Sequence, residues 1–518
     1  MKIHVITNHK YIDEVQTIAQ VFIPHAKFSS EKNVTMTVFS LMPKASAAYT
    51  IASTIEGDMV LTRVYKHEAQ IGQHNLNIAT HPQDLTIKRL VMLAMYHAMQ
   101  EAIGAFTPWG ALTGVRPTKM VREWMANGQS DAEIAETLKS IFCVQEDRAR
   151  LAIDVAHAEN RLANQILTTS NDSHRRGGNL PPAHYNLPHK ARRQVAAPTK
   201  TAPIGLYISI PFCPSRCVYC SFNTAHKPWN TAMQEKYTQA LIKEAKDLPS
   251  KLNELNGHVS SIYIGGGTPT ALADNFLEQL LNAIQGLAAT PIEYTIEAGR
   301  PDTITPSNLK IMKKYGVNRI SINPQTFNDA TLEKIGRKHT TEDFLQAYEA
   351  ARVEGFTNIN TDIIAGLPGE GPRDMHHTME TLAKLSPENI TIHTLAIKRA
   401  SKLNEHRVDQ ALSDYALPDA AAIEAQLKIA HGGCASQGLI PYYLYRQKNM
   451  AALFENTGFA RPGKECLYNV GMMSEIQTVL GIGAGAVSKY IQGSLITRSF
   501  NTKNPEIYIE KTKEGTNQ

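Results

Sequence analysis

Short apolar runs alternate with longer amphipathic segments after about residue 205. The runs at 206–210, 259–264, 292–297, 317–323, 358–364 and 389–396 have the length and composition of buried strands. Between them, residues 233–248, 273–287 and 341–354 repeat apolar positions at three-to-four spacing, which is typical of helices. Parallel strands need crossover helices, so this alternation predicts a parallel sheet. We therefore expect an α/β fold with an open or complete barrel, whose functional site lies at the carboxyl ends of the strands.

The pattern changes on both sides of this region. Residues 1–167 begin with strand-like stretches, including 35–40 and a hairpin across 56–58, and continue with helical patterns from residue 85. Residues 168–202 lack apolar periodicity and cannot offset the entropy of ordering. After about residue 415, a helix at 419–437 leads into a mixed tail. We predict four segments: an α+β domain at 1–167, a flexible linker at 168–202, the barrel at 203–414 and a separate, mixed carboxyl-terminal domain at 415–518.

Composition narrows the class of protein. Of the 518 residues, 42% are hydrophobic, which suffices for several cores. The 53 Lys and Arg nearly balance the 48 Asp and Glu, so charge does not favour a nucleic-acid partner. The amino terminus does not resemble a secretory signal, and no uncharged apolar run reaches about 18 residues. Six cysteines in so long a chain do not suit a disulfide scaffold. We expect a cytoplasmic protein without a membrane span.

Three of the cysteines stand together directly after the first predicted strand. Cys213, Cys217 and Cys220 have the spacing C-x3-C-x2-C within IPFCPSRCVYCSF. Three thiolates on one loop can each bind one iron of a cuboidal 4Fe–4S cluster and leave the fourth iron open to another ligand. A tetrahedral zinc site would need a fourth protein ligand, for which the candidates His226 and Cys466 both lie outside the loop. The spacing therefore favours a catalytic iron–sulfur cluster.

This loop resembles that of the radical SAM enzymes, in which the open iron binds the amino and carboxylate groups of S-adenosylmethionine. The sequence GGGTPT at 265–270 follows the second predicted strand, and no Gly-Lys-Ser or Gly-Lys-Thr follows to favour a phosphate loop instead. NPQ at 323–325, GRKHT at 336–340 and NTDIIAGLPG at 360–369 then come in that family's order. The resemblance implies one set of residues that bind S-adenosylmethionine: Tyr207, Tyr219, Gly266, Gly267, Thr268, Glu297, Gln325, Arg337 and Asp362.

The resemblance also implies individual roles within this set. The glycine loop contacts the methionine amino group, and glycine suits a loop whose backbone must approach a ligand closely. Asp362 suits the ribose hydroxyls, and Arg337 suits a carboxylate. Glu297, at the end of the third strand, occupies the place of a carboxylate that helps to hold the S-adenosylmethionine molecules, so it joins the three cysteines as a catalytic candidate.

The resemblance extends from about residue 205 to the carboxyl terminus and narrows to the oxygen-independent coproporphyrinogen III dehydrogenases. Within that family the sequence is most similar to the HemZ group, through EAGRPDTIT at 297–305, HTLAIKRAS at 393–401 and PYYLYRQKN at 441–449. The resemblance implies a partial (β/α)6 barrel and conversion of two propionates of coproporphyrinogen III to vinyl groups. It also implies a 4Fe–4S cluster, one or two S-adenosylmethionine molecules and a low-potential electron donor such as flavodoxin or ferredoxin.

The chain departs from the well-studied members of this family at two positions. Ser209 stands where they have histidine, and Phe222 stands where they have a fourth cysteine. Relatives without the fourth cysteine include heme-transfer proteins and heme-degrading enzymes, so both functions remain as alternatives. Candidates for contact with the propionates and the ring faces lie after the sixth strand and in the tail: Lys398, Arg399, Lys402, Tyr442, Tyr443, Tyr445, Arg446 and Lys448.

Other features carry less chemistry. Residues 481–486 match a G-x-G-x-x-A dinucleotide fingerprint, but fewer than 40 residues follow, which leaves little room for such a domain. His393, on the sixth predicted strand, could face the reacting centre, although filling the barrel is the interpretation that we favour. The scattered Cys143, Cys434 and Cys466 are expected to be small buried side chains.

Overall fold

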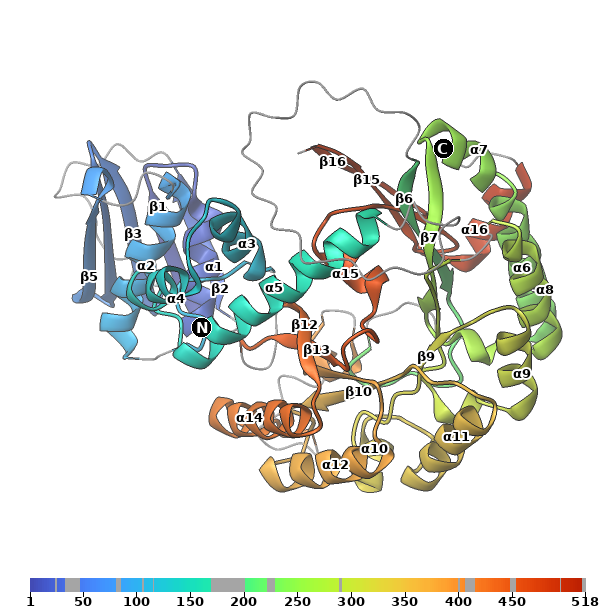
Figure 1. Cartoon of the computed structure of the whole chain (residues 1–518). Helices are drawn as coiled ribbons and strands as arrows, with labels where there is room; N and C mark the ends of the chain where they lie inside the picture. Colours follow the sequence, from blue (N-terminus) through green and yellow to red (C-terminus); the bar gives the residue numbers. More distant parts are fainter. Residues whose placement is uncertain are drawn as a thin grey trace. The chain divides into compact units, whose positions relative to one another are not determined.

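A computed structural model describes the chain as two compact units, Met1–Ile153 and Asp154–Gln518 (Figure 1). The described residues are 1–23, 26–32, 47–80, 85–104, 107–114, 116–168, 201–220, 229–287, 291–398, 401–405, 415–447, 453–493 and 495–514. The strand predicted at 35–40 and nearly all of the linker predicted at 168–202 lie outside them. None of the described helices combines the length and apolar character needed to cross a bilayer.

The first unit contains a five-stranded sheet in the order β2-β1-β3-β4-β5. Its strands are β1 (Lys2–Thr7), β2 (Lys27–Lys32), β3 (Tyr49–Glu56), β4 (Met59–Lys66) and β5 (Ala69–Asn77). Its helices are α1 (Ile12–Phe22), α2 (Ile87–Ile103), α3 (Thr118–Ala126), α4 (Asp131–Ser140) and the first part of α5 (Glu146–Thr168). The predicted hairpin is confirmed, because Glu56 pairs with Met59 and Gly57 has a φ of +58°, which favours glycine. This unit has the expected α+β character.

The second unit contains the predicted parallel sheet. Its central strands are β6 (Ala202–Ile210), β7 (Gly257–Gly266), β8 (Glu293–Glu297), β9 (Arg319–Ser321), β10 (Ile359–Ala365) and β11 (Asn389–Thr394). Each pairs in parallel with the next along the chain, so all six strands predicted from the apolar runs are confirmed. Among the described residues the sheet remains open, with β12 and β16 at its two edges, and the barrel is therefore partial.

Crossover helices lie on the outer side of this curved sheet (Figure 1). They are α6 (Thr231–Ala245), α7 (Leu248–Glu254), α8 (Asp274–Gln285), α9 (Pro306–Lys314), α10 (Asp329–Lys334), α11 (Thr341–Val353) and α12 (Pro372–Leu385). The apolar faces of all but α10 pack on the strands in one continuous core, while Leu332 of α10 belongs to a smaller cluster with Val218 of the cysteine loop. Thr340 shows how the sequence starts such a helix: its side chain accepts from the backbone N–H of Asp343, and the Asp343 carboxylate accepts from that of Thr340.

The carboxyl-terminal part differs from the separate domain expected from the sequence, because its strands extend the same sheet. After the short helix α13 (Lys402–Glu405), its elements are α14 (Ala420–Ser436), β12 (Ile440–Tyr445), β13 (Asn456–Ala460), α15 (Leu467–Met473), β14 (Thr478–Ile482), β15 (Val487–Gln492), β16 (Leu495–Phe500) and α16 (Pro505–Glu514). Strand β13 pairs with β11, and β14 pairs in parallel with β6. Residues 154–518 consequently form one unit. The borders at 167, 202 and 414 remain predictions.

The glycine segment after β14 has a structural explanation. The chain turns through Gly483, with a φ of +96°, and enters the antiparallel strand β15, where a dinucleotide-binding fold would continue into a helix. A Cβ on Gly483 would lie 2.6 Å from the carbonyl oxygen of Ser209. Ser209 itself is buried and donates to the carbonyl of Ala484 over 2.8 Å. Glycine is needed here so that this turn can pack against β6.

Glu370, in the loop between β10 and α12, predicts a pH effect on stability. Burial raises its pKa to about 7, although hydrogen bonds from Thr326 and Thr331 act in the opposite direction. The folded state therefore holds this proton more tightly than the unfolded chain, and the resulting stability is lost as the pH rises through about 7. Compared with Glu370→Gln, the wild type should lose about 2 kcal/mol of unfolding free energy between pH 5 and pH 8.

Urea unfolding of both proteins at these two pH values measures the difference. Glu380→Gln, at an exposed position on α12, is the control and should follow the wild type. An identical pH dependence for wild type and Glu370→Gln would contradict the prediction.

Candidate active site

The three cysteines lie in an irregular loop after β6, at the carboxyl end of the sheet. Cys217 is buried, and Cys213 and Cys220 are partly exposed. Burial raises the pKa of the Cys213 thiol, and the nearby Cys220 and Cys217 raise it further, so the three sulfurs lie within electrostatic reach of one another. The loop thus brings the three predicted thiols together. Phe222 and His226 lie outside the described residues.

The glycine loop after β7 packs directly on the cysteine loop. The backbone N–H of Gly267 donates to the carbonyl of Ile210 over 2.7 Å, and that of Thr268 donates to Phe212 over 2.6 Å. The Thr268 hydroxyl lies 3.3 Å from the Cys213 sulfur. A Cβ on Gly267 would lie 2.5 Å from the carbonyl oxygen of Phe212, so glycine is required for this contact alone. Close approach to a ligand remains the sequence-based prediction for this loop.

Glu297 ends β8 beside the same loop. Its carboxylate accepts hydrogen bonds from the Tyr263 hydroxyl at 2.6 Å and from the backbone N–H of Gly266 at 3.2 Å. Burial raises the pKa of Glu297, and the charge of Asp362 also raises it, while the Tyr263 hydrogen bond lowers it. The rings of Tyr207 and Tyr468 stack with the ring of Tyr263 and with each other. Glu297 and Asp362, predicted separately from the sequence, thus influence each other.

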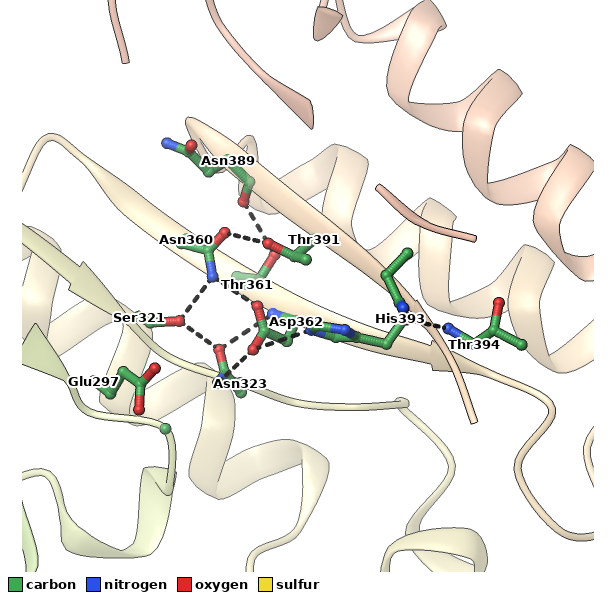
Figure 2. Close-up of polar contacts among 12 residues, drawn as sticks. Glu297, Ser321, Asn323, Asn360, Thr361, Asp362, Asn389, Thr391, His393 and Thr394 are labelled. Carbon is green, nitrogen blue, oxygen red and sulfur yellow. Dashed lines mark hydrogen bonds and ion pairs between the residues drawn. The ribbon is translucent and has the colours of Figure 1, made fainter. Parts of the chain in front are cut away.

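Asp362 lies at the centre of a polar network that joins β9, β10 and β11 (Figure 2). Its Oδ1 accepts from the Asn360 amide over 2.7 Å, and its Oδ2 accepts from the Asn323 amide over 2.9 Å. Nε2 of His393 lies 3.5 Å from Oδ2. Burial would raise the pKa of Asp362, but the hydrogen bond and charge of His393, together with Asn360, hold it below its usual value. The network keeps Asp362 ionised and fixes its orientation.

The network has further members that the sequence analysis did not identify. Ser321 donates to the side-chain oxygen of Asn323 and accepts from Asn360, and Thr391 donates to Asn360. The Tyr445 hydroxyl lies 3.4 Å from Nδ1 of His393. His393 therefore connects Asp362 to the tail strand β12, and the role of filling the barrel remains a prediction. The only sequence signal for these contacts is the clustering of polar residues near the ends of buried strands.

Gln325 and Arg337 are buried near this carboxyl edge with unused polar atoms. Gln325 has a φ of +69°, an unusual conformation for a residue other than glycine, and its backbone is held by hydrogen bonds with Asp362 and Ile364. Its Oε1 atom has no hydrogen-bond partner among the residues that the structure describes. Arg337 donates from Nη1 to the carbonyl of Gly299 over 2.7 Å, while its Nε atom also lacks a partner in the described parts of the chain. Buried polar atoms without partners indicate a place where a polar ligand can bind.

Arg300 is the functional candidate for which the sequence analysis gave no role, although it lies in the EAGRPDTIT motif. Its guanidinium is buried and touches Cys217 and Ser215 of the cysteine loop. Tyr219, on the same loop, interacts with Arg337, and the buried His339 lies nearby. Burial and the charges of Arg337 and Arg300 lower the pKa of His339 to about 4. Two buried guanidinium groups, those of Arg300 and Arg337, therefore lie beside the cysteine loop.

The tail residues proposed for porphyrin contact are placed differently from our expectation. Tyr442 and Tyr443 are buried in a core with α15, so their ring faces are covered. Arg446 is buried and donates to the carbonyl of Leu453. Tyr445 and Lys398 are partly exposed and Lys402 is exposed, so these three remain candidates. Arg399 and Lys448 lie outside the described residues.

The three cysteines and the polar side chains beside them fit an iron–sulfur cluster with a polar cosubstrate. Among the described residues, no three His, Cys, Asp or Glu side chains are arranged to hold one metal ion. A cuboidal cluster needs a different arrangement, in which each thiolate binds its own iron. Cys466 donates to Glu293 at the amino end of β8, whereas Cys213 lies beyond the carboxyl end of β6, so Cys466 cannot complete a zinc site with the loop. Gln325 and Arg337 supply polar atoms that could bind a ligand beside the cysteine loop.

Residues 207–382 match the sequence profile of the Radical SAM superfamily, which covers the cysteine loop and the barrel as far as α12. Over 440 residues the chain is 33% identical to the oxygen-independent coproporphyrinogen-III oxidase-like protein HemZ of Bacillus subtilis, with 83% of this chain and 80% of that protein covered. It therefore belongs to the radical SAM superfamily and, within it, to the oxygen-independent coproporphyrinogen-III oxidase-like proteins. Membership in the superfamily implies a 4Fe–4S cluster and S-adenosylmethionine as cofactors.

Two further proteins are similar to part of this chain. The heme chaperone HemW of Bacillus subtilis is 32% identical over 311 residues, which cover 60% of this chain and 76% of that protein. Among solved structures, coproporphyrinogen III oxidase HemN from Escherichia coli is 24% identical, with a TM-score of 0.49 over 60% of this chain and 70% of that chain.

Proposed function

We propose that this protein is a cytoplasmic oxygen-independent coproporphyrinogen III dehydrogenase. The observation that carries the proposal is the convergence of a three-cysteine loop, an ionised Asp362 and a partly buried Glu297 at one edge of the barrel, in a chain similar to HemZ. Cys213, Cys217 and Cys220 would hold the cluster. When bound, the cluster and S-adenosylmethionine supply a 5′-deoxyadenosyl radical that abstracts hydrogen atoms from a substrate.

The side chains around the loop have distinct tasks in this proposal. Asp362 accepts hydrogen bonds from the ribose hydroxyls, and Arg337 binds the methionine carboxylate. Gln325, with its unpartnered Oε1, accepts a polar hydrogen of the same molecule. Gly266, Gly267 and Thr268 place backbone near the amino group, and Tyr207, Tyr219 and Glu297 enclose the site. A second S-adenosylmethionine molecule, beside Glu297, is part of the proposal.

The substrate loses one hydrogen atom from each of two propionate β-carbons. Each propionate then releases carbon dioxide and passes one electron to a one-electron acceptor, and a vinyl group remains. Lys398 and Lys402, the two described cations that remain candidates, would bind propionate carboxylates, and Tyr445 would contact the ring. A low-potential donor such as flavodoxin or ferredoxin would reduce the cluster. The barrel excludes water, which protects the radical from side reactions.

Anaerobic turnover tests this function. The purified protein, with its cluster reconstituted, is incubated with dithionite, S-adenosylmethionine and either coproporphyrinogen III or heme. Release of carbon dioxide with formation of a divinyl product is the expected result. Cleavage of S-adenosylmethionine without any porphyrin product from coproporphyrinogen III would contradict it.

Heme carriage is the second candidate, because 60% of the chain is similar to a protein named as a heme chaperone. In that case the protein would retain heme stoichiometrically without consuming it. Loss of the heme absorption during turnover would instead support radical degradation of heme, the remaining alternative from the sequence.

His393 is expected to affect S-adenosylmethionine binding through Asp362. His393→Phe preserves a ring but removes the N–H that faces the carboxylate, so the Kd should rise about tenfold, as for the loss of one hydrogen bond to a charged group. His393→Gln can still present an amide N–H and should retain most of the affinity. Anaerobic calorimetry of both variants at equal iron content measures the difference, and equal Kd values for the two variants would refute this role.

A further inference from the structure

Arg300 is positioned by the first turn after β8. Arg300 directly precedes the short 3-10 helix Pro301–Thr303 and is its N-cap residue. Its side chain is only 4% exposed, and all three of its nitrogen groups make contacts. Nη1 donates to the Cys217 sulfur over 3.3 Å, Nη2 to the Ser215 hydroxyl over 2.6 Å, and Nε to the Asp302 carboxylate over 3.2 Å. A buried cation thus contacts a sulfur that would bind iron.

We propose that Arg300 sets the reduction potential of the cluster by stabilising its reduced state. The Cys217 thiol in the structure stands for the thiolate that would bind one iron. One electron added to the cluster increases the negative charge on its core and thiolates, and no proton is needed. A positive charge and an N–H donor at one sulfur favour this reduced state, because net charge and hydrogen bonds to sulfur are among the factors that set such potentials.

The buried position of Arg300 makes its effect on the reduction potential large. Charges interact more strongly in a buried environment than in water, because solvent screens them less. Arg300 is also held rigidly, since Ser215 and Asp302 fix the two ends of its guanidinium. The inference requires the cluster alone and does not depend on the porphyrin reaction.

The effect of changing Asp302 distinguishes an electrostatic role of Arg300 from a purely structural role in holding the cysteine loop. Its carboxylate is 20% exposed and partly neutralises Arg300. If charge sets the potential, removal of the cation and removal of the carboxylate must shift the potential in opposite directions. If Arg300 only holds the cysteine loop in place through Ser215, removal of the cation and removal of the carboxylate should both loosen the same contacts. Both changes should then shift the reduction potential in the same direction.

The experiment is a redox titration of the reconstituted protein, followed by electron paramagnetic resonance, without substrate. Arg300→Gln should lower the equilibrium constant for one-electron reduction about tenfold, which is a shift of about 59 mV to a more negative potential. Arg300→Lys, which keeps the charge, should shift the potential less. Asp302→Asn should shift it to a more positive value. Arg352→Gln, which removes a distant ion pair with Glu388, is the control and should leave the potential unchanged.

Iron content is measured for every variant, so that cluster loss is not mistaken for a change in potential. If Arg300→Gln fails to incorporate iron, the shift in Asp302→Asn decides the question. A positive shift in that variant supports the proposal. Unchanged potentials in the loaded variants, or shifts of Arg300→Gln and Asp302→Asn in the same direction, would overturn it.

Discussion

Cys217→Ser is expected to abolish the brown chromophore and all cleavage of S-adenosylmethionine. Serine shortens the side chain and replaces the thiolate with a hydroxyl, so one iron of the cluster loses its ligand. The position is buried, so solvent has little access to replace the missing sulfur. The guanidinium of Arg300 would also lose its sulfur partner. Loss of the cluster, rather than a weaker reaction, should result.

Iron and sulfide analysis, visible absorption and release of methionine under dithionite measure this outcome. Cys143→Ser is the matched control, because Cys143 is partly exposed and lies in the other unit, outside the candidate site. It should load iron and cleave S-adenosylmethionine like the wild type. Full iron content and activity in Cys217→Ser would exclude this cysteine as a cluster ligand.

Features that depend on short stretches of sequence were predicted correctly. The apolar runs predict six strands, and the helices between them predict that consecutive strands pair in parallel. All six strands are present. The cysteine loop and the GGGT loop were expected at neighbouring strand ends, and the structure joins them through hydrogen bonds from Gly267 and Thr268. Parallel topology alone places these loops together, because consecutive strands end at the same edge.

Features that depend on strand register could not be predicted. The contact between Asn360 and Ser321 exists because these residues are paired across β10 and β9, which the sequence does not specify. Tyr442 and Tyr443 show the same limit. Adjacent residues of a regular strand point to opposite faces, but the register of β12 shifts between Pro441 and Tyr443, and both tyrosines are buried. The sequence analysis offered both tyrosines as candidates for contact with the ring faces of a porphyrin.

Asp362→Asn is expected to weaken S-adenosylmethionine binding by at least about a hundredfold, which corresponds to the loss of one or two hydrogen bonds to a charged acceptor. In the wild type the carboxylate accepts from Asn323 and Asn360, with His393 nearby. An asparagine amide has one acceptor oxygen, so its NH2 group would have to face one of these donors. The variant therefore loses both the charge that attracts the ribose hydroxyls and the network that orients it.

Cluster content separates this effect from general disruption. The side chain of Asp362 contacts Asn323, Asn360 and His393, none of which belongs to the cysteine loop, so Asp362→Asn should load iron normally while its Kd, measured by anaerobic calorimetry, rises. Asp419→Asn is the matched control, because Asp419 is an exposed helix cap and asparagine caps helices as well as aspartate does. An unchanged Kd in Asp362→Asn would mean that the ribose binds elsewhere. The network around Asp362 would then serve only to join three strands, and the choice of cofactor contacts at the carboxyl edge would have to be revised.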